Sequence, residues 1–368
     1  MPVQTSRQNK KRKSGSVTIK DVANHAGVSL TTASAALHHT GRISDHRRSE
    51  ILKVASEIGY QPRTAARLMR SKKTGHLGLV INQVNPLSAF RHGNHRHYIA
   101  HFIQSCEERN IPYHLDFCNI ATNSTVPPRH AAGGLVDGIL VLGDDVDRPL
   151  IDKQASPMHK WLKQFDKPAI TLSSHSHWSV LSDTEEGIFL ALQQLHAMGH
   201  RRVGFVSGDE MYKYNKVFQD GFTHAVDALK LHTKNDWQIA VQASALNTSQ
   251  VMDNVLEQTR HILTSDDRPT AFYCNGGEKM RAVIEAARQV GLNVPNQVSV
   301  IGNCSAIYAC DGYPRLSAVH RDVSAIIEHA IDMLKQCIAD PKKDAQSLKI
   351  VPKLAMRQTV GKVESDPS

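Results

Sequence analysis

The chain has 368 residues, of which 40% are hydrophobic and 21% are charged. This length predicts two or three folded units, and the composition excludes a disordered or collagen-like chain. There is no run of roughly 18 or more apolar residues and no apolar stretch behind the basic N-terminus, so we expect neither a membrane span nor a secretory signal. Six scattered cysteines without a CxxC pair argue against a disulfide framework or a zinc finger and fit a reduced cytoplasm.

The positive charge is concentrated at the start of the chain. Residues 1–75 contain 15 Lys and Arg against 4 Asp and Glu, a net charge of +11. Residues 76–368 contain 29 Lys and Arg against 31 Asp and Glu, a net charge of −2. A basic module joined to a near-neutral body predicts an anionic polymer as the partner of the module. A solvated basic tail is the alternative for the Lys/Arg run at 10–13 taken alone.

Two short helices with a glycine between them follow the basic tail. Thr18 can cap the first helix, Asp21 places a carboxylate near its free amides, and Gly27 ends it. Ser29 is the cap of a second helix over residues 30–37. The apolar face of the first helix comprises Ile19, Val22, Ala23 and Ala26. Two short helices joined by a turn that contains glycine predict a helix-turn-helix pair.

A third helix is expected from the cap at Ser44 to Gly59. Its apolar face comprises Ile51, Leu52, Val54, Ala55 and Ile58. The side chains expected where the helices approach closely are small: Ala23, Ala33 and Ala36. The three helices make a compact unit of about 45 residues, which is the size of a helix-turn-helix domain.

In such a unit the second helix lies in the major groove, where hydroxyl groups can bond to base edges and methyl groups can pack on thymine. The candidate major-groove residues are Ser29, Leu30, Thr31, Thr32, Ser34 and Ala35. The candidate DNA-backbone residues are Thr18, His38, His39, Arg42 and Arg47, with Arg48 beside them. A small helical bundle with exposed polar residues is the alternative interpretation of this pattern alone.

A short arginine-rich segment comes next. Pro62 opens an expected helix of about eight residues, which is too short to be stable by itself in water. Arginines at helical spacing and an apolar pair fit entry into a minor groove. The candidate hinge and minor-groove residues are Arg63, Ala66, Arg67, Leu68 and Met69. A plain interdomain linker is the alternative.

Three segments of this region resemble the start of the lactose-repressor family of bacterial transcription regulators. They are Thr-Ile-Lys-Asp-Val-Ala at 18–23, Ala-Gly-Val-Ser at 26–29 and Gly-Tyr-Gln-Pro-Arg-Thr-Ala-Ala-Arg at 59–67. The resemblance implies a hinge helix that begins at the proline, with Met69 where the family has a leucine wedge. The family's recognition helix usually reads Val-Ser-Arg where this chain has Ala-Ser-Ala at 33–35. We therefore do not expect the family's usual operator.

From residue 76 onward, short apolar runs alternate with helical stretches. The expected strands span 76–81, 113–118, 137–142, 168–172, 202–206, 237–241, 271–274 and 298–301. The clearest helices span 184–198, where Thr184 is the expected cap, and 278–290. Alternating strands and helices predict doubly wound α/β layers, and the length of this region predicts two lobes.

The predicted fold is therefore α/β: an N-terminal three-helix helix-turn-helix module with a hinge helix, followed by two doubly wound α/β lobes. The expected divisions are a basic disordered tail at 1–16, a helix-turn-helix domain at 17–61, a hinge helix and linker at 62–75 and a core at 76–368. Within the core we expect an N-lobe at about 76–178 and 320–345 and a C-lobe at about 179–319 and 346–362.

The resemblance extends over about residues 17–360. It implies lobes of the periplasmic sugar-binding type, three crossings of the chain between them, a cleft for a small effector and a dimer interface. The candidate cleft residues are Asn85, Phe90, Asp183, Phe218, Asn275, Asn303 and Cys304. Charged anchors that the family uses are replaced, for example by Phe218 where an arginine is usual and by Gly276 where an aspartate is usual. Either the ligand is different and less polar, or the cleft takes none.

Three other functions fit the sequence less well than a DNA-binding regulator. A metal site that joins histidines of the stretch 92–101 to Cys274 and Cys304 is conceivable, but the chain has 21 histidines and we expect no metal and no cofactor. A solute-binding protein would not need residues 17–70. A nucleotide-dependent α/β enzyme lacks its phosphate-binding loop, and no catalytic triad or carboxylate pair is recognisable. We expect a cytoplasmic, homodimeric, sequence-specific regulator, a repressor that binds a pseudo-palindromic double-stranded operator, with an effector of unknown identity and no enzymatic activity.

Overall fold

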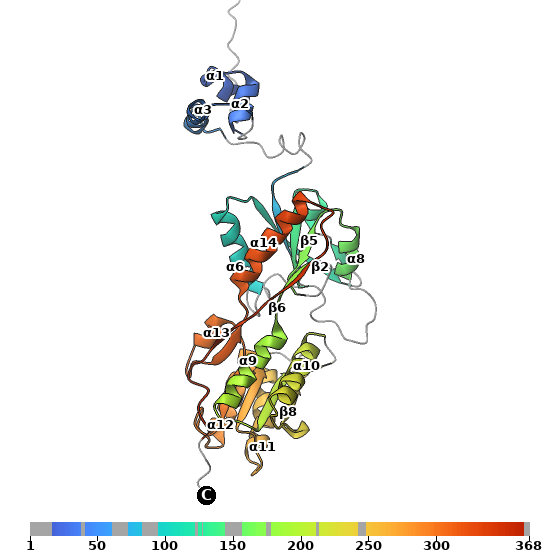
Figure 1. Ribbon diagram of the computed structural model, residues 1–368, viewed down its shortest axis with the longest axis vertical. Coiled ribbons are helices and arrows are strands. Elements are labelled where there is room, and N and C mark those ends of the chain that lie inside the picture. The colour runs from blue at the N-terminus through green and yellow to red at the C-terminus, as the bar shows by residue number, and fades with distance from the viewer. Residues whose placement is uncertain are drawn as a thin grey trace, which may run out of the picture. The chain divides into compact units, whose positions relative to one another are not determined.

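The computed structural model describes most of the chain, which divides into two compact units at residues 1–74 and 75–368. The described residues are 17–37, 41–60, 73–82, 95–121, 124–126, 128–143, 157–173, 178–210, 213–241 and 248–363. Several predicted site residues lie outside these ranges: His38, His39, Arg63, Ala66, Arg67, Leu68, Met69, Asn85 and Phe90. Each unit is described by itself below (Figure 1).

The first unit contains the three predicted helices, α1 (Ile19–His25), α2 (Leu30–Leu37) and α3 (Asp45–Glu57). Ser44 caps α3, as expected. Six side chains form the buried core of this domain: Val22, Ala23, Ala33, Ala36, Ile51 and Ala55. Because four of the six are alanines, the helix axes approach closely and the two larger side chains supply most of the apolar contact.

The first sheet of the body has seven strands in the order β12-β6-β5-β4-β1-β2-β3. Their bounds are β1 (Leu77–Asn82), β2 (Tyr113–Ala121), β3 (Ser124–Val126), β4 (Gly138–Leu142), β5 (Ala169–Thr171), β6 (Ser179–Ser182) and β12 (Ser347–Ile350). All neighbouring strands pair in parallel except β2 and β3. Every residue of β4 is buried, which explains its continuous apolar sequence.

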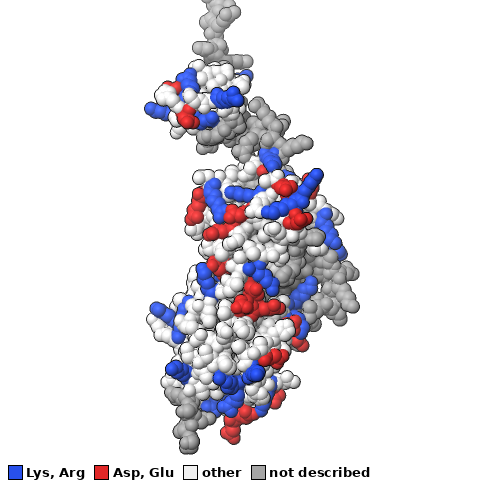
Figure 2. Space-filling view, viewed as in Figure 1, with Lys and Arg blue, Asp and Glu red and all other residues white. Residues whose placement is uncertain are grey.

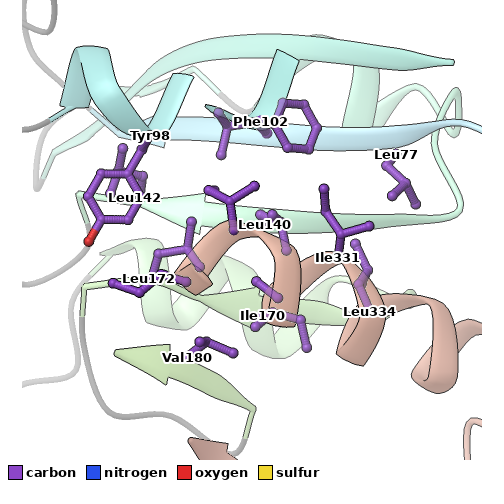
Figure 3. Close-up of a cluster of buried hydrophobic side chains, with 14 of the residues drawn as sticks. Leu77, Tyr98, Phe102, Leu140, Leu142, Ile170, Leu172, Val180, Ile331 and Leu334 are labelled. Carbon is purple, nitrogen blue, oxygen red and sulfur yellow. The ribbon is translucent and has the colours of Figure 1, made fainter. Parts of the chain in front are cut away.

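Helices cover both faces of this first sheet. Helices α6 (His95–Glu108) and α14 (Val323–Ala339) pack on one face, while α7 (Arg129–Ala132) and α8 (Pro157–Gln164) pack on the other. Figure 3 shows side chains of the larger core, among them Leu140, Ile170 and Leu334, gathered between the strands and α14.

The second sheet has six strands in the order β13-β11-β10-β9-β7-β8, parallel except for β13. Their bounds are β7 (Val203–Gly208), β8 (Gln238–Val241), β9 (Ala271–Asn275), β10 (Ser299–Asn303), β11 (Ser317–His320) and β13 (Lys353–Ala355). Helices α9 (Thr184–Ala197) and α10 (Lys213–Ala228) cover one face, and α11 (Thr248–Leu263) and α12 (Gly277–Gln289) cover the other. A 3-10 turn at Asn235–Trp237 and the short helix α13 (Ala306–Cys310) complete the lobe.

The two predicted doubly wound lobes are thus confirmed, and the chain crosses between them three times. It crosses after β6, after β11 and between β12 and β13. Two details were wrong. Strands β6 and β12 were assigned to the second lobe but hydrogen-bond within the first sheet, because their short polar-flanked sequences do not reveal which sheet they join. The cap of α9 is Asp183, not Thr184: its carboxylate accepts from the Glu186 amide at 3.3 Å.

Charged residues are mixed over the body. Figure 2 shows Lys and Arg side chains interspersed with Asp and Glu over the visible face, and the net charge of residues 76–368 is near zero. Among the residues that the structure describes, no helix has the length and apolar character needed to cross a membrane.

Candidate DNA-binding surface and effector cleft

Helix α2 presents its first turn to solvent. The Leu30 side chain is 42% exposed and Thr31 is exposed beside it, whereas Ala33 and Ala36 on the opposite face are fully buried. Ser34 and Ala35 are half-buried further along the helix. An exposed aliphatic side chain next to an exposed hydroxyl, held by a helix packed through alanines, is suited to reading a thymine methyl and a base edge.

The hydroxyl groups of Ser29 and Thr32 serve the start of α2. Ser29 Oγ accepts a hydrogen bond from the Thr32 amide at 3.1 Å and lies 2.8 Å from Thr32 Oγ1. Such a cap satisfies one of the free amides of the first turn. Both residues were predicted to contact bases. In this structure they bond to each other, and Ser29 is exposed together with Leu30 and Thr31, whereas Thr32 is half-buried.

Two of the predicted backbone contacts bond within the domain. Arg47 donates to Glu50 at 2.8 Å and to the carbonyl of Ala26 at 3.3 Å. The Thr18 hydroxyl donates to Asp21 Oδ2 at 2.7 Å, so this residue is part of the cap of α1. Contact with phosphate would require either side chain to exchange these partners. Arg42 is exposed just beyond α2.

Arg48 has a structural role that sequence patterns did not reveal. Its half-buried guanidinium donates to the carbonyls of Ala35 at 3.1 Å and Ala36 at 3.3 Å. The last carbonyls of a helix have no partner within the helix, so Arg48 on α3 satisfies the end of α2. It thereby joins the two helices and fixes the angle at which α2 is presented.

The body contains a cavity of about 360 Å³ between its two lobes. Side chains at its wall come from α6 of the first lobe and from α10, β9, β10 and β11 of the second. Three predicted cleft residues line it: Phe218, Asn303 and Cys304. The cavity therefore lies at the carboxyl ends of parallel strands, the usual place for ligands in open α/β sheets.

Asp183 and Asn275 were predicted at the cleft, but they do not line the cavity. Asp183 caps α9 and lies 3.7 Å from the ammonium of Lys349. Asn275 is buried at the end of β9, where its amide nitrogen donates to Ser207 Oγ at 3.3 Å. Asn275 is thus held within the second lobe, whereas Asp183 joins the start of α9 in the second lobe to Lys349 on β12 in the first.

Arg321 is a cleft residue that the sequence patterns did not single out. It lies between β11 and α14, where the chain crosses from the second lobe to the first, and it lines the cavity. Its guanidinium donates to the Tyr214 hydroxyl at 3.1 Å and lies over that ring, 5.8 Å from its centroid. The signal that could have revealed it is its position directly after a buried parallel strand.

Two polar atoms in the cavity wall are buried without a partner in the described part of the chain. They are Asn303 Oδ1 and His320 Nδ1. Burial lowers the pKa of His320, and the charges of Arg357 and Lys353 lower it further against a hydrogen bond with the backbone of Cys304. A neutral imidazole presents one nitrogen as an acceptor, and a carbonyl oxygen is always an acceptor. Both atoms are therefore suited to a ligand that donates hydrogen bonds.

Cys274 and Cys304 are not suited to redox sensing. Burial raises the pKa of the Cys304 thiol to about 12, and burial also raises the pKa of Cys274. A raised pKa keeps a thiol protonated and unreactive. Within the described ranges, no group of three or more His, Cys, Asp or Glu side chains is placed to hold a metal ion.

Comparison with known proteins defines the class. Residues 18–63 match the family model described as bacterial regulatory proteins, lacI family, and residues 192–360 match the periplasmic binding protein-like domain. These matches, with the exposed face of α2 and the interlobe cavity, define a helix-turn-helix DNA-binding transcription regulator with an effector-binding body. The chain thus carries a lacI-family helix-turn-helix domain, as the resemblance of its first segments implied, together with a periplasmic-binding-protein-like domain.

The curated relatives match along nearly the whole chain. An HTH-type transcriptional repressor PurR from Photobacterium profundum is 26% identical over 353 residues, which are 93% of this chain and 98% of the relative. The PurR of Yersinia pestis bv. Antiqua is 27% identical over 348 residues, 93% of this chain and 96% of the relative.

Solved structures share the fold. The lac repressor dimer bound to operator and the anti-inducer ONPF superposes with a TM-score of 0.70 at 18% identity, covering 94% of this chain and 100% of that one. A complex of the transcriptional regulator CelR with cellobiose gives a TM-score of 0.60 at 19% identity, covering 93% of this chain and 99% of that one.

Proposed function

We propose that the protein is a cytoplasmic repressor that binds a pseudo-palindromic operator as a homodimer and whose affinity for DNA changes when a small molecule occupies the interlobe cavity. One observation carries the DNA-binding part: α2 exposes Leu30 and Thr31 while its other face is fixed by buried alanines and by Arg48. The +11 charge of residues 1–75 supports it, since Lys and Arg displace counterions from DNA phosphates. The repressor names of the relatives support the sign of regulation.

The interlobe cavity supplies the regulatory part of the proposal. Its walls come from both lobes, and the three crossing segments join them. A ligand that contacts both lobes favours one lobe arrangement over others. In a dimer this arrangement sets the separation of the two DNA-binding domains, so ligand and DNA must affect each other's affinity equally. The predicted hinge residues at 62–75 would transmit this change and enter the minor groove.

Selection of operators from random double-stranded DNA by the full-length protein tests the proposal. We expect enrichment of one site with two inverted half-sites, bound by two chains in analytical ultracentrifugation. A single half-site bound by one chain would contradict the dimeric mode. No enrichment at moderate salt would contradict sequence-specific binding and leave a solute-binding protein with a general nucleic-acid tether.

We predict that Thr31→Ala and Leu30→Ala each weaken binding to the selected operator by about 1–3 kcal/mol, because each removes a direct contact to a base. In a binding competition, each variant should also lose preference at one position of each half-site. Fluorescence anisotropy with single-base operator variants measures both effects.

Ser56→Ala is the matched control, since Ser56 is exposed on α3 of the same domain. It should leave affinity and base preference unchanged. If Thr31→Ala weakens binding to every sequence equally, the residue contacts the DNA backbone and the assignment to base recognition is wrong.

A further inference from the structure

The cavity wall carries one cation that has no carboxylate partner. Its charged lining in the described part of the chain consists of Arg321, Lys353 and a single acidic residue, Asp322. Lys353 is paired with this carboxylate at 2.5 Å. Arg321 forms no ion pair with any described carboxylate, and the groups that act on its charge are tyrosines. A half-buried guanidinium without a carboxylate favours an anion at the site.

Three tyrosines from both lobes surround Arg321. Tyr214 on α10 accepts its hydrogen bond, and the buried Tyr273 on β9 is near enough to interact with the guanidinium electrostatically. Tyr98 on α6 of the first lobe is also near enough to Arg321 to interact with it electrostatically. In Figure 3 the Tyr98 ring belongs to the first-lobe core, with its hydroxyl at the edge of the cluster. Arg321 therefore joins the two lobes at a crossing segment.

The other groups in the cavity wall indicate which further chemical features a ligand needs. Asn303 Oδ1 and His320 Nδ1 are buried acceptors that lack donors, so a ligand would supply N–H or O–H groups to them. Phe218, which is 2% exposed, contributes an apolar wall with Tyr273 and Val319. The positive charge of the cavity wall therefore lies at Arg321 on the crossing segment, whereas α10 contributes the apolar side chain of Phe218.

We propose that the cavity binds a small organic carboxylate with an apolar body and at least one hydroxyl or amine group, in which Arg321 binds the carboxylate while Asn303 and His320 accept hydrogen bonds from the donor group. This inference rests on the proposed effector-regulated function. Because Arg321 bonds to Tyr214 of the second lobe and interacts electrostatically with Tyr98 of the first, a carboxylate that draws its guanidinium away from these tyrosines changes the interaction between the lobes. The same residue thus recognises the ligand and communicates its presence.

The test uses 4-hydroxybenzoate, 4-hydroxyphenylacetate and 3-(4-hydroxyphenyl)propionate, each compared with its uncharged primary amide. These acids share a carboxylate, a ring and a hydroxyl donor at three separations. Titration calorimetry with the full-length protein should show binding of at least one acid about 10- to 100-fold tighter than its amide, and Arg321→Met should remove this difference. Arg129→Met, which removes an exposed charge on α7, should leave it unchanged.

A second comparison tests the acceptors. The affinity of the bound acid should fall about tenfold when its hydroxyl is absent, and Asn303→Leu should abolish this dependence. Thermal unfolding of each variant shows whether it is folded. Equal binding of acid and amide, retention of acid binding by Arg321→Met, or binding of no acid at millimolar concentration would each overturn the proposal.

The experiments distinguish a failure of the carboxylate proposal from a failure of the proposed regulatory function. An enriched operator that Arg321→Met still binds, together with no acid binding, rejects the carboxylate and retains the regulator. Arg321-dependent acid binding without an enriched operator retains the ligand site and rejects the regulator.

Discussion

Replacing Ile51 with alanine is expected to unfold the helix-turn-helix domain while residues 75–368 stay folded. Ile51 is fully buried and is one of only two large side chains among the six buried core residues of the domain. Truncation of a buried isoleucine costs about 2–5 kcal/mol, which is comparable with the whole stability of a domain this small. Operator binding should therefore be lost.

Hydrogen exchange measures this effect locally. Amides of α1, α2 and α3 should lose protection in Ile51→Ala, while those of β4 and β9 keep theirs, because the two units have separate cores. Ile51→Val should cost only about 0.5–1.5 kcal/mol and retain operator binding. Val351→Ala, at a side chain that is 54% exposed, is the surface control. Unchanged protection of the three helices in Ile51→Ala would show that Ile51 does not hold the domain together.

The domain and both lobes could be predicted from the sequence because their signals are local. Ser44 as a cap and Gly27 at a φ of +61° between α1 and α2 mark helix ends, and runs such as 138–142 are apolar throughout because parallel strands are buried on both faces. The sheet membership of β6 and β12 is set by pairing of β6 with β5 and of β12 with β6, which leaves no local pattern in either strand. The helices were thus predicted more accurately than the lobe boundaries.

The candidate site was only partly predictable for the same reason. The positions of Phe218, Asn303 and Cys304 could be carried over from the resemblance, because each stands where the family has a cleft residue, and all three line the cavity. Arg321 lies in no such segment, and its importance comes from tyrosines more than 40 residues away in sequence. Exposure of Leu30 and the bond between Ser29 and Thr32 likewise depend on packing geometry. Sequence patterns locate the elements, whereas the pairing of side chains across elements requires coordinates.

We expect the stability of the second lobe to depend more on His200 than on any other polar residue. It is 2% exposed, with Nδ1 3.0 Å from Thr270 Oγ1 and Nε2 3.1 Å from the carbonyl of Gly361. Ser299 Oγ lies 2.9 Å from Nε2 and accepts from the Gly361 amide at 3.0 Å. This network of hydrogen bonds connects Gly361 in the C-terminal segment to Ser299 on β10. His200→Ala leaves buried polar groups unpaired at about 1–3 kcal/mol each, so we expect a total loss of about 3–5 kcal/mol.

The same residue predicts a pH dependence. Burial lowers the pKa of His200, as does the charge of Arg201, and together they outweigh the hydrogen bond to Gly361, which raises it. The unfolded chain, with a histidine pKa of about 6.5, therefore binds the proton more readily than the folded one. The contribution of His200 is complete above this value and is lost as the pH falls from there through the folded-state pKa. Below pH about 6.5 the free energy of unfolding should decline by up to about 1.4 kcal/mol per pH unit from this residue.

Chemical denaturation of wild type and His200→Ala at a series of pH values separates the two effects. Burial also lowers the pKa of His97, His114 and His320, so both proteins lose stability in acid, and the prediction concerns the difference between them. That difference should be largest above neutral pH and shrink below pH about 6.5. His224→Ala, at an exposed position of α10, should follow wild type throughout. A constant difference at every pH would mean that His200 acts through packing alone and that its protonation is the same in the folded and unfolded chain.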